Sequence, residues 1–201
     1  MSTFRNLTTR ALLLGFLLAL VASANVFAQE IFQLDPAKSS VHFTLSDVLH
    51  TVHGSFKVRH GMLQMESTGG MSGEIVVDAA SGDSGSGMRD RKMHKEVLES
   101  ALYPEIAFRP GRIEGNVASQ GKSSVMVHGM FSIHGVDREI TVPAQVEISA
   151  DHWTATVHFS VPYEKWGMKN PSTLFLRVSD TVEIELAATG SVVRSTANSA
   201  Q

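Results

Sequence analysis

The sequence predicts an all-β fold with one helix: an extended eight-stranded antiparallel β-barrel with an amphipathic helix inserted near residues 88–100. Apolar and polar residues alternate along most of the chain, turn-forming residues separate the alternating runs, and one segment breaks the alternation. Successive side chains of a strand point to opposite faces, so this pattern favours antiparallel strands with one buried face. Closure into a barrel removes the exposed edges of such a sheet.

The alternating runs predict eight strands and one further long strand towards the C-terminus. Gly69-Gly70, His134-Gly135 and Ala150-Asp151 lie where short hairpin connections are expected. The first strand is able to run on into the second through the Asp35-Pro36 corner. The predicted strands cover residues 31–35, 39–47, 51–66, 71–78, 105–117, 122–134, 137–150, 152–162 and 174–190.

The segment that breaks the alternation is 88–100 (MRDRKMHKEVLES), whose apolar residues fall on one side at helical spacing. This pattern predicts an amphipathic helix of three to four turns. Residues 81–87 (SGDSGSG) before it have the composition of a flexible loop, and Tyr103-Pro104 ends it.

The N-terminus has the features of a cleavable secretory signal peptide over residues 1–28. Arg5 and Arg10 precede an apolar run at 11–21, and small residues at 26–28 (VFA) fit a signal-peptidase site. A membrane anchor is the alternative, but a spanning helix needs roughly 20 apolar residues. We therefore expect a mature chain that begins near Gln29 and works in the periplasm or outside the cell.

The net charge and the absence of cysteine exclude several classes of function. From residue 29 onward the chain has 15 basic and 20 acidic residues, a net charge of −5, whereas a nucleic-acid binder normally carries a basic stripe. It has no cysteine, which excludes disulfides and thiol catalysis. No later stretch is long and apolar enough to span a membrane, and the polar tail at 191–201 is expected to be disordered.

The residues expected to face the barrel interior are apolar and often aromatic, so any ligand held there would be apolar. An ordinary packed core without a cavity is the alternative. No cofactor is expected. The candidate ligand-binding residues, with two from the long connection before the last strand, are Phe43, Leu45, Phe56, Val58, Val77, Phe108, Phe131, Phe159, Trp166 and Phe175.

Histidines and carboxylates are expected on the outside. A surface metal site from His128 and His158 would need their strands to pair, and no standard zinc-ligand spacing is present. No Gly-x-Ser-x-Gly elbow occurs, and Asp90, Glu96 and Glu99 are expected on the solvent side of the helix. Neither a catalytic residue nor a resident metal is therefore predicted. The histidines with clear outward parity are His42, His53, His128, His134, His152 and His158.

The connection at 161–177 (VPYEKWGMKNPSTLFLR) halts the alternation between two strong strands. Long loops with large apolar tips commonly line the mouth of a pocket. The alternative is a packed Ω-type connection that plugs the end of the barrel, and the sequence leaves both open.

Several short motifs, in order, resemble those of one family. The chain resembles the YceI-like proteins, exported bacterial lipocalin-like barrels associated with binding isoprenoid and other long-chain lipids. The similarity covers roughly residues 31–190. Its motifs are 34–43 (LDPAKSSVHF), 52–56 (VHGSF), 88–93 (MRDRKM), 103–108 (YPEIAF) and 127–138 (VHGMFSIHGVDR).

The resemblance implies an extended, lipocalin-like barrel over residues 29–190 with a helix beside it, and a long isoprenoid or fatty tail held inside. Two segments depart from the family pattern. Residues 46–48 read SDV where many members have His-Leu-Gly, and 165–168 read KWGM in place of a shorter "RxxFG" loop. The second departure implies a subgroup with a different ligand or pocket mouth.

Three functions follow as hypotheses. The first is an exported carrier, storage or sequestration protein for a long-chain lipid, with a homodimer as an open option for its assembly. The second is a non-enzymatic, stress-related periplasmic protein with a filled core. The third is a hydrolase on the same barrel, which would require two titratable groups facing each other inside.

Overall fold

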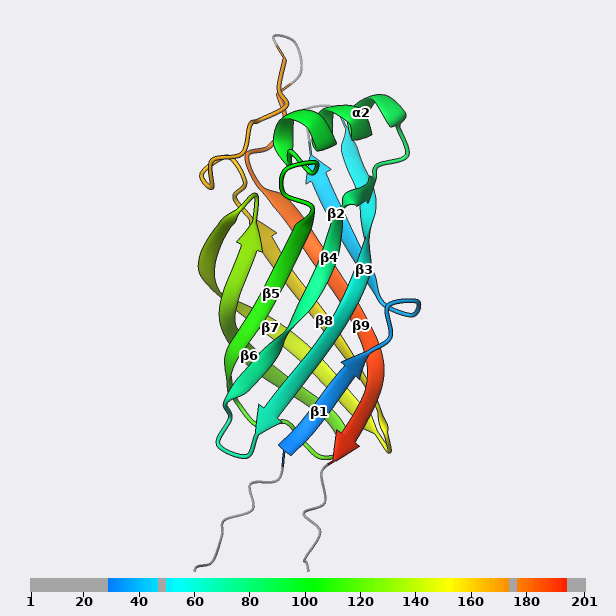
Figure 1. The fold of residues 1–201 in the computed structure, drawn as a ribbon, viewed down its shortest axis with the longest axis vertical. Coiled ribbons are helices and arrows are strands. Elements are labelled where there is room, and N and C mark those ends of the chain that lie inside the picture. Colours follow the sequence, from blue (N-terminus) through cyan, green and yellow to red (C-terminus); the bar gives the residue numbers. More distant parts are fainter. Residues whose placement is uncertain (1–28, 47–49, 174–176, 195–201) are drawn as a thin grey trace, which may run out of the picture.

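The structure, a computed structural model, is a closed antiparallel β-barrel with one short helical segment, as predicted (Figure 1). It describes residues 29–46, 50–173 and 177–194. The expected signal peptide at 1–28 and the end of the expected tail at 195–201 lie outside the described residues. None of the helices in the described part is long and apolar enough to cross a membrane.

Nine strands form the sheet, and the helical segment follows β4. The strands are β1 (Gln29–Leu34), β2 (Ser40–Ser46), β3 (Thr51–Glu66), β4 (Met71–Asp83), β5 (Glu105–Glu114), β6 (Gly121–Ile133), β7 (Val136–Ser149), β8 (His152–Val161) and β9 (Val182–Arg194).

The nine strands occupy eight positions around the barrel, because β1 and β2 share one. Both lie between β3 and β9: β1 pairs with the end of β3 and the end of β9, and β2 pairs with the beginnings of the same two strands. The corner at Asp35 separates them, with its backbone N–H donating to the carbonyl of Thr189 at 2.8 Å. The pairing of β3 with β4 completes the ring.

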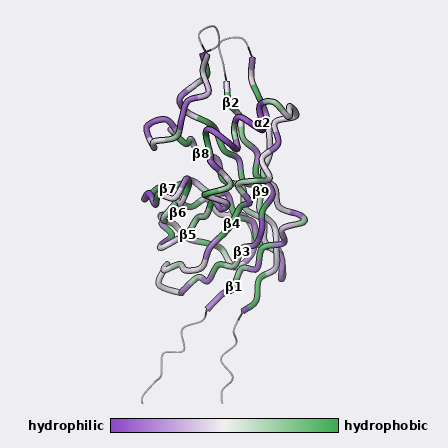
Figure 2. Tube along the Cα trace, turned by 45° about the horizontal axis from the view of Figure 1, so that its top comes forward, coloured by the Kyte–Doolittle hydropathy of each residue, from purple (hydrophilic) through white to green (hydrophobic). Residues whose placement is uncertain are grey.

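Alternation places one face of each strand inside the barrel, and the alternating colours along the chain in Figure 2 follow this pattern. In β3 the register shifts between Val58 and His60. This bulge changes the inward parity, so both Phe56 before it and Leu63 after it pack against the buried core. One long strand thereby keeps an apolar inner face along its whole length.

The expected hairpin turns are present. His134 and Gly135 connect β6 to β7 with φ values of 54° and 71°. Two consecutive positive φ angles are typical of the type I′ turn, whose twist matches that of the flanking strands. Ala150, with φ of 54°, begins the turn between β7 and β8.

The expected boundaries of three elements were wrong. β4 continues through Asp83, so residues 81–83 are strand and not flexible loop. The last strand begins at Val182 and continues to Arg194, so the first four residues of the expected disordered tail pair with β1. The helix is shorter than 88–100: α2 (Gly87–Lys92) runs into the π-helical turn η1 (Met93–Val97).

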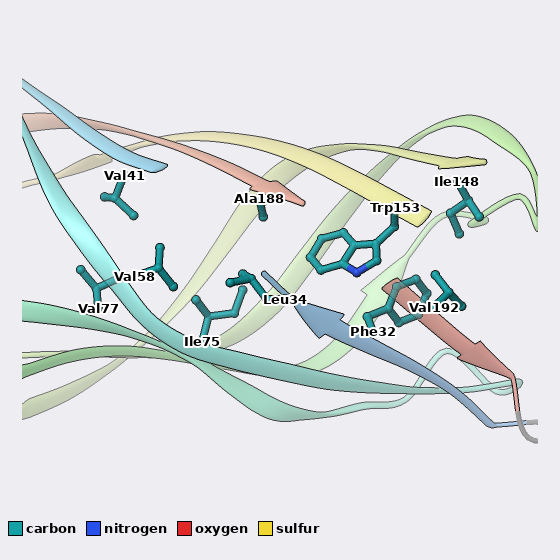
Figure 3. Packing of buried hydrophobic residues seen from close by; sticks show 10 residues of the cluster. All are labelled: Phe32, Leu34, Val41, Val58, Ile75, Val77, Ile148, Trp153, Ala188 and Val192. Carbon is teal, nitrogen blue, oxygen red and sulfur yellow. The ribbon is translucent and has the colours of Figure 1, made fainter. Parts of the chain in front are cut away.

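Two apolar clusters lie inside the barrel. The first cluster runs from Phe32, Ile148, Trp153 and Val192, at the end away from the helix, to Val41 and Val77, and its side chains project inward from several strands (Figure 3). The cluster at the helix end includes Leu98, Phe131 and Val161. Residues of both clusters line the cavity that forms the candidate site.

Candidate ligand-binding cavity

A cavity of about 550 Å³ lies in the barrel interior and is lined by residues of both clusters. This volume lies within the range of about 300–1,000 Å³ that is usual for small-molecule sites. Its wall consists of inward apolar side chains from the strands, with Met93, Val97 and Leu98 of the helical segment at one end and Phe32 and Trp153 towards the other. The side chains therefore do not fill the interior of the barrel, and the alternative of a packed core without a cavity was wrong.

Seven of the ten candidate ligand-binding residues line this cavity. They are Phe43, Leu45, Phe56, Val77, Phe108, Phe131 and Phe159.

The other three candidates have different positions. Val58 is buried and packs beside Val77 within the first cluster, without lining the cavity. Trp166 is half-buried and contacts the ring of Phe131 at 5.9 Å, with the Arg138 guanidinium 4.9 Å from the centre of the Trp166 ring. Trp166 therefore packs against the lining residue Phe131 and does not itself line the cavity. Phe175 lies outside the described residues.

The connection before β9 combines both alternatives that the sequence left open. Its first half packs into the barrel end, since Tyr163 and Met168 are buried in the cluster at the helix end. The Tyr163 hydroxyl donates to the Ser179 carbonyl at 2.5 Å, and burial, with the nearby charges of Glu164 and Asp180, raises the pKa of Tyr163 to about 12. Tyr163 and Met168 also line the cavity, as do Pro171 and Val178 from the second half.

The helical segment lies across the upper end of the barrel in Figure 1 and is fastened to β4 by a compact polar cluster. The Ser84 hydroxyl donates to Asp90 Oδ1 at 2.6 Å, and the Ser84 backbone N–H donates to the same oxygen at 2.9 Å. The Arg89 guanidinium donates to the Ser84 carbonyl at 2.8 Å. Ser84 is buried and lines the cavity, so this cluster shapes its end.

Two more carboxylates bind neighbouring segments. Glu96 accepts from Lys169 Nζ at 2.6 Å, and this hydrogen bond and charge hold the pKa of Glu96 below its usual value. Glu99 Oε2 lies 2.7 Å from His134 Nε2 in the β6–β7 turn. Glu96 is exposed, as expected, whereas Asp90 and Glu99 are only half-exposed. Each of the three also joins the helical region to a different part of the barrel end.

Replacing Asp90 with alanine should loosen this end of the barrel. The Ser84 hydrogen bonds, with a smaller effect from the charges of His94 and Arg89, hold the pKa of Asp90 below its usual 3.8. Charged hydrogen bonds of this kind contribute about 1–2 kcal/mol after allowance for partial exposure. We expect Asp90→Ala to lower Tm by about 2–8 °C at neutral pH.

The pH dependence of that loss follows from the lowered pKa. A depressed carboxyl pKa stabilises the folded state fully above the unfolded-state value and loses this effect as pH falls through the folded-state value. The Tm values of wild type and Asp90→Ala should therefore converge in acid, below about pH 4. Glu139→Ala, at an exposed site on β7, is the matched control. A constant Tm difference down to pH 2 would contradict this account.

Polar lining groups gather at the helix end of the cavity. Apart from Trp153, the polar side chains that line it in the described part of the chain are Ser84, Ser86, Arg89, Lys92, Tyr163 and Thr173. No histidine and no carboxylate belongs to this lining. The described interior thus lacks the acid–base pair that hydrolysis would require.

The histidines lie away from the cavity, as the parity of the strands predicted. β7 lies between β6 and β8, so the strands of His128 and His158 do not pair and the two residues form no shared metal site. Within the described ranges, no group of three or more potential ligands is placed to hold a metal ion.

The sequence model of the YceI-like domain matches residues 32–189, nearly the whole barrel. The chain belongs to the YceI-like family. None of the curated proteins matches it by sequence.

Solved structures share the fold of this YceI-like barrel at low sequence identity. A polyisoprenoid binding domain from Saccharophagus degradans, implicated in plant cell wall breakdown, has a TM-score of 0.67 and 17% identity over 81% of this chain and 98% of that one. Burkholderia cenocepacia BcnA has a TM-score of 0.64 and 19% identity, over 78% and 99% of the two chains. The Campylobacter jejuni YCEI protein has a TM-score of 0.58 and 14% identity, over 71% and 86%.

Sequence reasoning missed the residues that build the helix end of the YceI-like cavity. Ser84 looked like part of a flexible loop, and Lys92, which donates to the Pro171 carbonyl at 2.8 Å, looked like a solvated helix residue. The available signal was the family-like motif at 88–93, in which an arginine and an aspartate are adjacent at the start of a helix.

Proposed function

We propose that this YceI-like protein binds one long-chain apolar lipid, isoprenoid or fatty-acid-like, inside the barrel. The observation that carries the proposal is a long apolar cavity whose ionisable lining groups all lie at one end. A hydrocarbon chain fits such a wall without any charged contact, and each buried methylene contributes about 0.8 kcal/mol. A polar head group would then lie near Arg89 and Lys92 at the helix end.

The physiological role we propose is that of an exported carrier, storage or sequestration protein in the periplasm or outside the cell. The signal-like N-terminal sequence supports export. Cellular fractionation of the full chain, with mass analysis of its mature N-terminus, tests this part. Retention of residues 1–28 on a cytoplasmic protein would contradict it. Homodimerisation remains a prediction that light scattering checks.

Native mass spectrometry of protein purified without detergent, followed by organic extraction, tests ligand binding. We expect one lipid per chain, or uptake of one prenyl-chain or fatty-chain probe by the extracted protein. A chain that carries no lipid and takes up neither probe would contradict the proposal. The described cavity wall gives no support to a hydrolase, because no carboxylate or histidine lines it.

A further inference from the structure

The cavity reaches the surface of the molecule at the helix end. Among the described residues that line it, the exposed ones are Met88, Arg89 and Thr173, and all the others are buried or half-buried. These three belong to α2 or to the connection before β9, and the helical segment lies across this end of the barrel (Figure 1). We therefore expect a ligand to enter and leave beside the helix.

The segments around this opening differ in charge from the rest of the barrel. Residues 87–99, 161–173 and 177–181 contain seven basic and five acidic residues, a net charge of +2. The remaining chain from residue 29 onward has eight basic and fifteen acidic residues, a net charge of −7. The protein is therefore acidic along the barrel but basic around the opening.

Two cations of the helical segment are available to a partner. Its acidic neighbours Asp90, Glu96 and Glu99 are each hydrogen-bonded to another side chain of the protein. Arg91 and Lys95 are exposed, and among the described residues neither side chain has a hydrogen-bond or ion-pair partner. They are four residues apart and so lie on the same side of the helical segment.

Met88 adds an apolar side chain to this surface. It is 75% exposed, the largest value among the large hydrophobic residues in the described part of the chain, and it borders the cavity. Lys and Arg beside exposed apolar side chains are typical of helices that lie in a membrane interface. An acidic protein would attract the same cations but would not supply a long-chain lipid, whose apolar chain avoids water.

We propose that the helix end of the barrel docks on the surface of an anionic lipid bilayer, so that a lipid passes directly between the bilayer and the cavity. Arg91 and Lys95 contact the head groups, and Met88 enters their boundary with the acyl chains. This inference rests on the proposed lipid-binding function and adds the partner that supplies the ligand.

The acidic barrel does not prevent this contact. β4, with 13 residues, extends over about 40 Å, whereas charges are screened over about 10 Å at 0.1 M salt. Carboxylates towards the other end of the barrel are therefore too distant to repel a membrane at the opening.

Cosedimentation of the full chain with vesicles tests the docking. Wild type should bind phosphatidylcholine vesicles that contain about one third phosphatidylglycerol more tightly, by about tenfold or more, than vesicles of phosphatidylcholine alone. Each cation near an anionic surface strengthens binding about fivefold. The double variant Arg91→Glu/Lys95→Glu should therefore bind the anionic vesicles more weakly than wild type by about tenfold or more.

Lys38→Glu/Lys122→Glu is the matched control, because it changes the net charge equally but away from the opening. Lys38 lies at the corner between β1 and β2, Lys122 lies at the beginning of β6, and both side chains are exposed. This variant should bind the anionic vesicles as wild type does. All versions share residues 1–28, so any contribution of that sequence to vesicle binding is the same in each.

Binding of a prenyl-chain or fatty-chain probe without vesicles separates the two proposals. Arg91 and Lys95 do not line the cavity, so their double variant should keep the probe affinity and the Tm of wild type. Equal binding of wild type to both kinds of vesicle, or an equal loss in the two double variants, would overturn the docking and leave lipid binding intact. Failure of wild type to bind the probe would overturn lipid binding and, with it, the transfer of lipid from the bilayer.

Discussion

Replacing Val157 with tryptophan should weaken binding of a long-chain lipid probe by about 10–100-fold, because the larger side chain takes up space that the ligand needs. Val157 is half-buried on β8, pairs with Ala144 of β7 and Leu186 of β9, and lines the cavity. The indole would extend into open volume and not into packed atoms. Tm should therefore change by no more than about 4 °C.

Thr156→Trp is the matched control, since the adjacent residue of the same strand has the opposite parity and does not line the cavity. It should leave probe affinity unchanged. A barrel with no usable interior space would respond differently: Val157→Trp would overpack it at a cost of about 1–3 kcal/mol. A large drop in Tm with unchanged probe affinity would therefore contradict an open, ligand-binding interior.

Gly190→Ala should destabilise the whole barrel, by about 3 kcal/mol or more. Gly190 of β9 pairs with both Leu34 of β1 and Trp153 of β8. A Cβ atom there would lie 1.9 Å from the Gln33 carbonyl oxygen and 2.9 Å from the Leu34 Cα, both of them backbone atoms. To relieve the contact, β1 would have to move away from β9 at the end where Phe32 and Trp153 pack.

Gly111→Ala in β5 is the matched control, because the nearest atom to its new Cβ, the His128 carbonyl oxygen, is 3.8 Å away. Urea unfolding should find the free energy of unfolding of Gly111→Ala within about 0.5 kcal/mol of wild type. If Gly190→Ala unfolds at the same urea concentration as Gly111→Ala, then β1 is not held against β9 as the structure describes.

The fold could be predicted closely because its main determinant is local. Alternation along β6, β7 and β8 fixed which residues face inward, and the turn residues His134 and Gly135 fixed where β6 ends. Boundaries that depend on distant partners were the ones missed. Residues 191–194 look like a polar tail in isolation but become strand because β1 lies beside them.

Only the site residues that lie in strands could be predicted, because the alternation of a strand shows which side chains face inward. Phe43, Phe56 and Phe159 line the cavity because they lie at inward positions of regular strands. Trp166 lies in a connection whose path depends on packing against Phe131 and Arg138, which no local pattern reveals. The polar contacts of Asp90 and Lys92 likewise join residues that come together only in the folded barrel.

The most direct test of a lipid-binding interior is a crystal structure of the full chain, expressed in bacterial cells and purified without detergent. We predict continuous, elongated density along the barrel axis, bordered by Phe43, Val157 and Phe159. An interior in which these side chains have closed upon one another, or one that holds only separate water molecules, would contradict the account.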